Sequence, residues 1–234
     1  MDPTYTFGNG IRVRRSDLIP IQLERYASPG NPNLHEPIEE RWLLNTFVKE
    51  LPASPVFLDI GAGIGYYSAL VKMRWPEALI FAVEALPRHR EAISVTMELN
   101  GFNPADVSIY PVALAGSTGT GTFVDEGFGS FLDSRRRPGV QVQIVRTRSL
   151  DSLLQELPPV HMMKMDIQGA ELETLTASPN ALARYHVRHA VIGTHGFKLH
   201  HEVRAVLETH GYSIVFDDPA PAMQPDGLII ATLR

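Results

Sequence analysis

The chain has 234 residues and a formal net charge of -5, and it is 44% hydrophobic and 20% charged. Its 21 lysines and arginines are scattered, which excludes a strongly basic nucleic-acid-binding surface. The absence of cysteine excludes a disulfide framework, a thiolate metal site and a cysteine nucleophile. This length suits one hydrophobic core, so we expect a single domain over residues 1–234. No signal peptide is apparent and no apolar run approaches the ~18 residues of a membrane span, so we expect a soluble, cytoplasmic protein without a membrane or nucleic-acid partner.

Residues 1–35 are predicted to form an N-terminal extension. Residues 4–13 alternate around G-N-G and predict a hairpin, whereas residues 16–35 contain prolines at 20, 29 and 32 and are expected to be irregular. A helix is predicted to begin near Pro37, with Glu39 and Glu40 favourable in its first turn. The segment L-P-A-S-P at 51–55 ends it.

From residue 56 onwards, apolar runs alternate with segments of helical spacing, which predicts an α/β fold with a mostly parallel sheet and helices on both faces. The expected strands are residues 56–58, 79–83, 107–112, 161–165, 189–192, 213–216 and 228–233, and the expected helices are 66–74, 87–100, 149–154, 169–175 and 198–211. Residues 119–124 and 141–146 predict an antiparallel insertion over 119–147, with a mobile loop at 125–139.

The stretch V-F-L-D-I-G-A-G-I-G-Y-Y-S, residues 56–68, joins a buried strand to a helix through three glycines. Glycine permits positive φ angles and lets the backbone approach a ligand closely, and a helix start offers unpaired N–H groups. The arrangement is typical of a nucleotide-binding turn. The dinucleotide pattern G-x-G-x-x-G is not met, because its last position is Tyr66 in one frame and Ser68 in the other.

Two acids near this turn favour S-adenosylmethionine as the ligand. Asp59 precedes the glycines, where a carboxylate would repel a pyrophosphate but would suit the ammonium group of S-adenosylmethionine. Glu84 ends the next apolar run, 19 residues after Gly65, which is the spacing of an acid that accepts the ribose hydroxyls. A glycine turn without a ligand is the alternative interpretation.

Four polar side chains, those of Asp59, Glu84, Asp166 and His195, are expected where strands end, and ligands of parallel sheets bind beyond these ends. Asp166 is a candidate to contact the acceptor or the cofactor, and its alternative role is a helix N-cap. His195 is a candidate general base, because histidine titrates near neutral pH, and its alternative is a structural histidine.

Lys164 lies two residues before Asp166, on the same face of the strand, and is predicted to pair with Asp166 or Glu171. The alternative is a lysine that reaches solvent, which its methionine neighbours disfavour. Glu171 begins the next helix, where the helix dipole alone would explain it. Asp166, Glu171 and His195 have the side chains of a metal site, but no spacing requires one, and we expect no metal.

The run K-M-D-I-Q-G-A-E-L-E-T-L, residues 164–175, resembles the pattern K-x-D-I-E/Q-G-x-E of the FkbM family of S-adenosylmethionine-dependent methyltransferases. The glycine turn, V-R-T-R-S-L-D-S-L-L at 145–154, V-E-A-L-P at 83–87 and Asn100 are also similar to the family. Gly63 stands where the family commonly has asparagine, and His35 precedes Glu36 where the family commonly has tyrosine. The likeness covers roughly residues 35–216.

This resemblance implies a doubly wound, Rossmann-like class I methyltransferase sheet of seven strands, the last one antiparallel, in a core over residues 56–234. It implies methyl transfer from S-adenosylmethionine to a hydroxyl of a small molecule such as a polyketide or a sugar. Residues 1–35 and 119–147 lie outside the core βα repeat, so we expect them to form a lid over the acceptor. The oligomeric state, a homodimer included, stays open. The expected catalytic residues are Asp166, His195, Lys164 and Glu171, and the expected cofactor-binding residues are Asp59, Gly61, Ala62, Gly63, Gly65, Glu84, Ala85, Glu36 and Asp166.

Two alternatives stay open on the sequence. A nicotinamide-dependent oxidoreductase is disfavoured by Asp59 and by the broken glycine pattern. A non-catalytic protein that binds the cofactor or a partner is disfavoured by the intact acids at positions 59, 84, 166 and 171.

Overall fold

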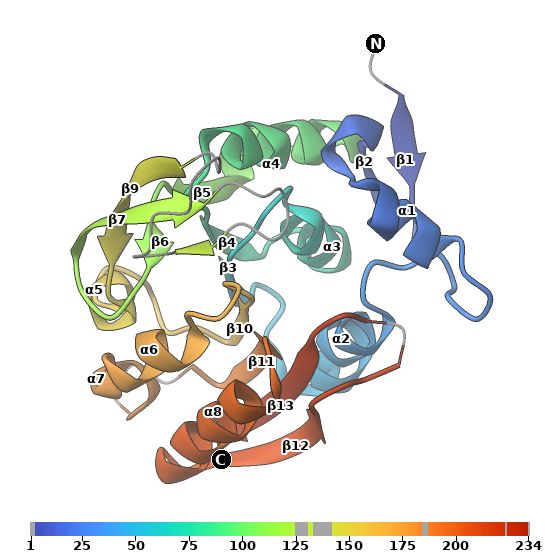
Figure 1. Ribbon diagram of the computed structural model, residues 1–234. Coiled ribbons are helices and arrows are strands. Elements are labelled where there is room, and N and C mark those ends of the chain that lie inside the picture. Colours follow the sequence, from blue (N-terminus) through green and yellow to red (C-terminus); the bar gives the residue numbers. More distant parts are fainter. Residues whose placement is uncertain (1–2, 125–130, 133–141, 184–186, 223, 234) are drawn as a thin grey trace.

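In the computed structural model, which describes residues 3–124, 131–132, 142–183, 187–222 and 224–233, the apolar runs form one central sheet (Figure 1). Its seven strands lie in the order β12-β13-β11-β10-β3-β4-β5. In that order they span Tyr212–Asp218, Gly227–Leu233, His189–Thr194, Met162–Met165, Val56–Ile60, Leu79–Val83 and Val107–Tyr110. Every pair of neighbours is parallel except the two pairs that contain β13. The predicted doubly wound sheet with an antiparallel last strand is confirmed.

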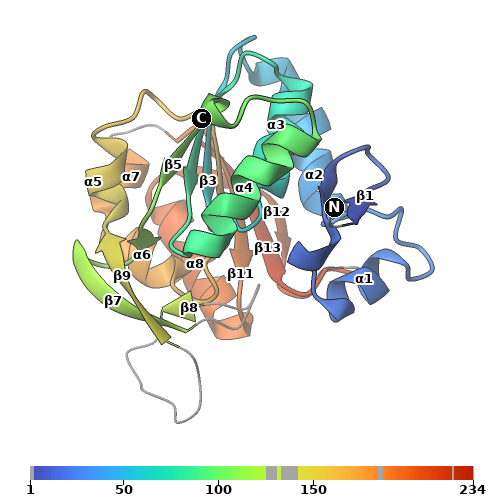
Figure 2. The ribbon, with the colours of Figure 1, turned by 90° about the horizontal axis from the view of Figure 1, so that it is seen from above.

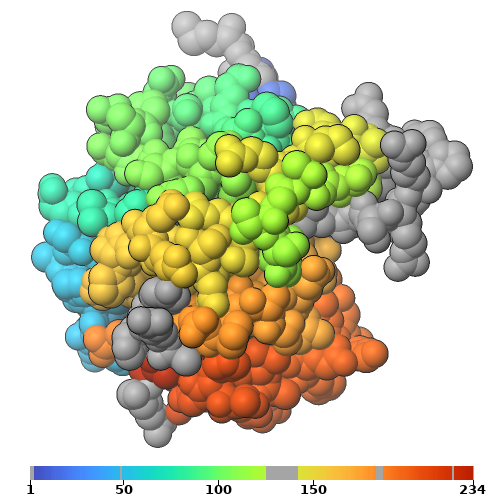
Figure 3. Space-filling model, turned by 90° about the vertical axis from the view of Figure 1, so that its left-hand side faces the viewer, coloured from blue at the N-terminus to red at the C-terminus, as the bar shows by residue number. Residues whose placement is uncertain are grey.

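Helices cover both faces of the sheet (Figure 2). One face carries α2 (Pro37–Arg41), α3 (Tyr66–Arg74) and α4 (Pro87–Leu99), and the other carries α5 (Leu150–Leu154), α6 (Glu171–Thr176), α7 (Pro179–Ala183) and α8 (Phe197–Thr209). Figure 3 shows the side of the molecule where the yellow segment with α5 lies above the orange and red segments of α6 and α8. Successive strand residues alternate between the two cores, so that Phe57 packs with one helix layer and Leu58 with the other.

The expected helices are present, and α7 is an addition to them. A short 3₁₀ turn, Pro104–Asp106, precedes β5, and α2 continues as a π-helical turn, Trp42–Thr46, and a 3₁₀ turn, Phe47–Glu50. Among the described residues, no helix combines the length and the apolar character needed to cross a membrane.

The N-terminal extension differs from its prediction in one element. The hairpin is confirmed as β1 (Thr4–Thr6) and β2 (Arg12–Arg14), and a 3₁₀ turn follows at Arg15–Asp17. The segment expected to be irregular contains helix α1, Pro20–Tyr26. Pro20 takes the first helical position, where a missing N–H costs nothing, and the Gln22 side chain accepts the backbone N–H of Ile19 at 3.1 Å. The proline therefore begins a helix rather than excluding one.

The expected antiparallel insertion forms a second sheet beside the first (Figure 1). Strand β7 (Gly119–Val124) pairs with β9 (Val142–Arg148), which confirms the predicted pair, and the sheet also contains β6 (Ala113–Leu114) and β8 (Phe131–Leu132). The loop expected at 125–139 lies outside the described residues apart from β8, so its role as a lid stays a prediction.

The register of the central strands gathers the loops that form the site. Lys164 of β10 lies opposite Asp59 of β3, and Thr194 of β11 lies opposite Gly227 of β13. Because parallel strands end at a common edge, the loops after β3, β4, β10 and β11 meet there. Strand β13 is antiparallel, so its beginning, not its end, lies at the same edge.

The turn after β3 gives a first test of this packing. A Cβ on Gly61, whose φ is +74°, would lie 1.9 Å from the backbone oxygen of Asp166, whereas a Cβ on Gly101, whose φ is +78°, meets nothing within 4 Å. Both alanine substitutions carry the roughly 1 kcal/mol cost of a left-handed alanine. We expect Gly61→Ala to lower the free energy of unfolding in urea by at least about 2 kcal/mol more than Gly101→Ala. Equal losses for the two variants would contradict the close approach of β3 and β10.

Candidate active site

The loop between β3 and α3 is held by backbone contacts at its three glycines. Gly61, Gly63 and Gly65 all have positive φ angles, and Gly65 is the N-cap of α3. The N–H of Gly61 donates to the backbone oxygen of Val83 at 3.0 Å. Asparagine is the residue that tolerates such φ angles best after glycine, so Gly63 meets the backbone requirement of the asparagine common in the FkbM family.

A first cavity opens in front of this loop. Six of the expected cofactor-binding residues line it: Gly61, Ala62, Gly63, Glu84, Ala85 and Asp166. Lys164, expected to be catalytic, also lines it. Asp59, Gly65 and Glu36 are not among its lining residues.

Glu84 is fixed by the backbone on both sides. One carboxylate oxygen accepts the N–H of Gly63 at 2.9 Å, and the other accepts the N–H of Leu86 at 2.8 Å. Each carboxylate oxygen has a second lone pair, so Glu84 keeps capacity to accept hydroxyl groups in the cavity. Its predicted ribose contact fits this geometry and stays a prediction.

Asp59 lies behind the loop rather than in the cavity. Its side chain is buried and accepts the Ser68 hydroxyl at 2.7 Å. Burial raises the pKa of Asp59 to about 6, although the charge of Lys164 and the bond from Ser68 oppose this. The arrangement ties β3 to α3, and a direct contact with the cofactor ammonium stays a prediction.

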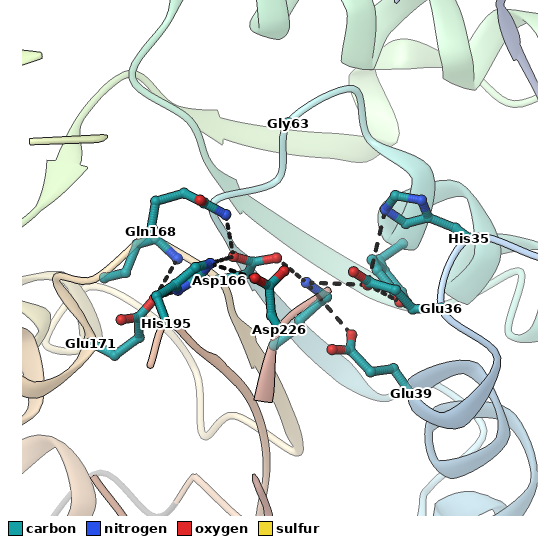
Figure 4. A network of polar contacts seen from close by, with 12 residues as sticks. His35, Glu36, Glu39, Gly63, Asp166, Gln168, Glu171, His195 and Asp226 are labelled. Carbon is teal, nitrogen blue, oxygen red and sulfur yellow. Dashed lines mark hydrogen bonds and ion pairs between the residues drawn. The ribbon is translucent and has the colours of Figure 1, made fainter. Parts of the chain in front are cut away.

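Lys164 is the centre of a buried ion-pair network, and Figure 4 labels its carboxylate partners Glu36, Glu39 and Asp166. Its Nζ atom lies 3.4 Å from Asp166, 3.6 Å from Glu39 and 4.0 Å from Glu36. Burial opposes its charge, but these carboxylates outweigh burial and raise the pKa of Lys164 well above its ordinary value. The predicted pairing with Asp166 is present, whereas no ion pair joins Lys164 to Glu171 among the described residues.

Glu36 and Glu39 both lie close to Lys164, but their pKa values are shifted in opposite directions. Burial and the neighbouring charge of Glu36 raise the pKa of Glu39 well above its usual range. Burial also acts on Glu36, but the charges of His35 and Lys164 and a 2.6 Å bond from the Tyr67 hydroxyl outweigh it and lower the pKa of Glu36 to about 2. Glu36 therefore carries the negative charge. Glu39 lies in the first turn of α2, as expected, and it is also a buried partner of Lys164.

Asp166 is held between three side chains. One oxygen accepts the Gln168 amide at 3.1 Å and lies 3.6 Å from His195 Nε2, and the other lies 3.4 Å from Lys164 Nζ. Gln168 has a φ of +56°, an unusual backbone conformation for a non-glycine residue that is typical of functional sites. Sequence patterns alone do not identify Gln168 as a residue that orients Asp166.

His195 and Glu171 lie beside the first cavity, not in it. His195 Nδ1 lies 3.1 Å from Glu171, and its Nε2 lies 3.2 Å from Asp226. Burial alone would lower the pKa of His195, but the neighbouring carboxylates of Asp226, Glu171 and Asp166 raise it to about 10. An unperturbed histidine would titrate near 6.5; here the carboxylates favour the imidazolium at neutral pH over the neutral form that a general base needs. Glu171 is fully buried and accepts the N–H groups of Ile167 and Gly169.

A second cavity of about 480 Å³ lies beside the first. Its walls come from α1, the start of α2 and the segment before β13. Asp166, Gln168 and His35 line both cavities, and we call these residues the junction. Glu36 faces this second cavity rather than the first, so its expected cofactor contact stays a prediction.

The comparisons with known proteins agree with this geometry. A model of the methyltransferase FkbM domain matches residues 59–214. The chain belongs to the FkbM methyltransferase family. The matched region is a methyltransferase domain of a family that uses S-adenosylmethionine.

Relatives of this FkbM methyltransferase differ widely in sequence. Methyltransferase sdnD of Sordaria araneosa is 27% identical over 161 residues, which are 55% of this chain and 62% of that protein, so the chain spans under two thirds of its relative. Among solved structures, the precorrin-6y C5,15-methyltransferase of Geobacter metallireducens has a TM-score of 0.54 and 16% identity over 91% of this chain and 96% of the other. The FkbM methyltransferase of Methylobacillus flagellatus has a TM-score of 0.53 and 16% identity, and the match covers 76% of this chain and 44% of the other. Fibrillarin of Aeropyrum pernix, in complex with S-adenosylmethionine, has a TM-score of 0.51 and 11% identity, and the match covers 99% of this chain and 82% of the other. These likenesses support the fold.

Two groups of side chains at the site have the ligand types of a metal site. Asp166, Glu171 and His195 each offer an atom within 4.8 Å of the others, and so do Glu36, Asp166 and Asp226. Glu171 is already occupied by two backbone N–H groups and by His195. The expectation that no metal is needed stays a prediction.

Two residues of the site carry little signal in the sequence. His35 appears only as a departure from the FkbM pattern, yet it lines both cavities. Burial lowers the pKa of His35 to about 4, so its imidazole is neutral at pH 7. Asp226 stands before β13, whereas the predicted site residues lie at the ends of strands. Because β13 is antiparallel, its beginning lies at the site.

The charge of His195 is measurable. Its folded-state pKa lies above the unfolded value, so its contribution to stability is fully present below pH 6.5 and is lost as the pH rises through about 10. We expect His195→Gln to lower the free energy of unfolding more at pH 7 than at pH 10.5. Nitrogen-15 NMR spectra should show the His195 imidazolium up to about pH 9 and a neutral His35 ring. Titration of His195 near pH 6.5 would contradict this assignment.

The role of Glu84 in cofactor binding gives a second prediction for the site. Glu84→Gln leaves one acceptor oxygen where two backbone N–H groups now donate, so the glycine loop loses one of its contacts. We expect calorimetric titration to show S-adenosylhomocysteine binding at least tenfold more weakly, about 1.4 kcal/mol. Glu77→Gln changes an exposed acid and is the matched control. Equal affinities for the two variants would exclude Glu84 from the cofactor site.

Proposed function

We propose that this FkbM methyltransferase transfers the methyl group of S-adenosylmethionine to a hydroxyl oxygen of a small molecule in the second cavity. The observation that carries the proposal is the junction, where Asp166, Gln168 and His35 line both cavities. A cofactor in the first cavity and an acceptor in the second would meet at the carboxylate of Asp166. A cavity of about 480 Å³ is of the size that binds small molecules.

The residues at the junction suit the alignment of a hydroxyl. Bound S-adenosylmethionine supplies a methyl group that its sulfonium has already activated, so the protein mainly has to position the acceptor. Asp166 can accept the hydroxyl proton, because the Gln168 amide and the Lys164 ammonium hold its carboxylate in place. Lys164, Glu171 and His195 then act as positioning residues around Asp166.

His195 is not the base in this proposal. An imidazolium has no lone pair, and His195 keeps its proton at neutral pH because Asp226, Glu171 and Asp166 surround it. His35 is neutral and lies at the junction, but its Nδ1 is 2.6 Å from the Tyr26 hydroxyl. The Tyr26 hydroxyl thus occupies one ring nitrogen of His35, and the proposal assigns the proton to Asp166 rather than to His35.

The polar walls of the second cavity suit an acceptor with several hydroxyl groups, such as a sugar or an oxidised polyketide. Amides at Gln22, Gln168 and Gln224 offer both donors and acceptors. The remaining alternative, a protein that binds S-adenosylmethionine without turnover, predicts binding of the cofactor and no methylated product with any acceptor.

The proposal is tested by the position of the transferred methyl group. Isotopically labelled S-adenosylmethionine is incubated with a panel of hydroxylated sugars, phenols and polyketides, with and without a metal chelator, and products are examined by NMR. A methyl ether supports the proposal, whereas methylation only at nitrogen or carbon, or no methylation of any acceptor, contradicts it.

Asp166→Asn keeps the shape of the residue and removes its capacity to take a proton. We expect turnover to fall at least roughly a hundredfold, a loss typical of general-base removal. Cofactor affinity should fall as well, because Asp166 lines both cavities. Asp106→Asn changes an exposed carboxylate and should leave both quantities unchanged. Wild-type turnover in the Asp166 variant would exclude it as the base.

A further inference from the structure

The second cavity contains an unpaired cation. Arg25, on α1, lines this cavity, and its side chain is half-buried. Its Nε atom is buried and has no hydrogen-bond partner, and Arg25 takes part in no ion pair within 4 Å among the described residues. The guanidinium lies over the Tyr26 ring, 5.3 Å from its centre, which restricts its position. A partly buried guanidinium that has no ion-pair partner within 4 Å in the described residues is available to bind an anionic ligand.

A second, independent group in the same cavity also lacks a partner. Gln224, in the segment before β13, is only 9% exposed, and its Oε1 atom is buried without a hydrogen-bond partner within the described part of the chain. Gln224 and Arg25 line the cavity from different elements. Buried polar atoms in folded proteins are nearly always paired. One missing partner must accept hydrogen bonds from Arg25, and the other must donate one to Gln224.

The charges in this cavity are separated. Glu36, Asp166 and Asp226 lie together, with one carboxylate oxygen of each within 4.8 Å of the others. Asp166 belongs to the junction with the first cavity, and Arg25 does not line the first cavity. The second cavity therefore holds an anionic cluster that includes the junction residue Asp166, and a cationic group, Arg25, contributed by α1. A molecule with a hydroxyl at one end and a negative charge at the other matches this distribution.

We propose that the acceptor is a hydroxy acid whose carboxylate binds Arg25 while the hydroxyl to be methylated lies at Asp166. The inference rests on the function proposed above and specifies its substrate class. A single guanidinium near three carboxylates balances a monoanion better than a doubly charged phosphate, so a carboxylate is the expected group. A further hydroxyl of the acceptor would donate to Gln224, which favours a polyhydroxylated acid such as a uronate.

Matched pairs of small molecules test the charge requirement. Glucuronate is compared with glucuronamide, and 4-hydroxyphenylacetate with 4-hydroxyphenylacetamide; glucose 6-phosphate serves as the phosphate probe. Binding to protein saturated with S-adenosylhomocysteine is measured by ligand-observed NMR titration. We expect the acid of at least one pair to bind at least tenfold more tightly than its amide, and glucose 6-phosphate to bind more weakly than glucuronate. Equal binding of acid and amide in both pairs would overturn the inference, and tighter binding of the phosphate would overturn the choice of a carboxylate.

Variants of Arg25 test whether this residue causes the preference for the acid over its amide. Arg25→Gln should remove the preference for the acid, and Arg25→Lys, which keeps the charge but loses the planar fork, should keep part of it. Arg41→Gln removes an exposed charge on α2 and should leave the preference unchanged. Unchanged affinity for S-adenosylhomocysteine shows that each variant is folded. A preference that survives in Arg25→Gln would overturn the inference.

The same samples, with S-adenosylmethionine added, separate the two proposals. Methylation of uncharged alcohols without any preference for acids supports the proposed function and overturns the inference. Acids that bind through Arg25 support the inference, and if no acceptor is then methylated, it is the proposed function that fails.

Discussion

The arrangement of the site depends on one buried ammonium group. Lys164 lies on the central strand β10, and its charge is tolerated in the interior because Glu36, Glu39 and Asp166 surround it. These carboxylates in turn stay close to one another only because Lys164 lies among them. The network joins α2, at the end of the N-terminal extension, to the strand that carries Asp166. A wall of the second cavity and the proposed base are thus held by the same ion pairs.

The reversed direction of β13 supplies the other half of the site. In a fully parallel sheet, the strand beside β11 would end at the site, and its preceding loop would lie at the opposite edge. Here β13 begins at the site, so Asp226 reaches His195 and Gln224 lines the second cavity. The antiparallel strand therefore contributes both to the charge of His195 and to the acceptor wall.

The sequence predicts the fold well, because the alternation of strands and helices and the glycine turn are local patterns. The boundaries of α3, β4 and β7 agree residue for residue with the expected ranges. The partners of the site are not local. Glu39 appears as an ordinary residue of a first helical turn, and only its contact with a strand over a hundred residues later shows that it is a buried partner of Lys164. Pro20 illustrates the same limit, because proline both ends helices and begins them, and the side chain of Gln22 decides between the two.

The two histidines of the site show why a role cannot be assigned from residue type and strand position. His195 stands at the expected strand end, but three carboxylates turn it into a cation that holds Asp166 in place. His35 is adjacent to Glu36 in the sequence, yet burial keeps it neutral, and the Tyr26 hydroxyl fixes one of its nitrogens. The balance between desolvation and nearby charge differs in sign at the two positions. In the proposed function, the carboxylate of Asp166 is consequently the group at the junction that takes a proton, and the cationic His195 helps to hold that carboxylate in place.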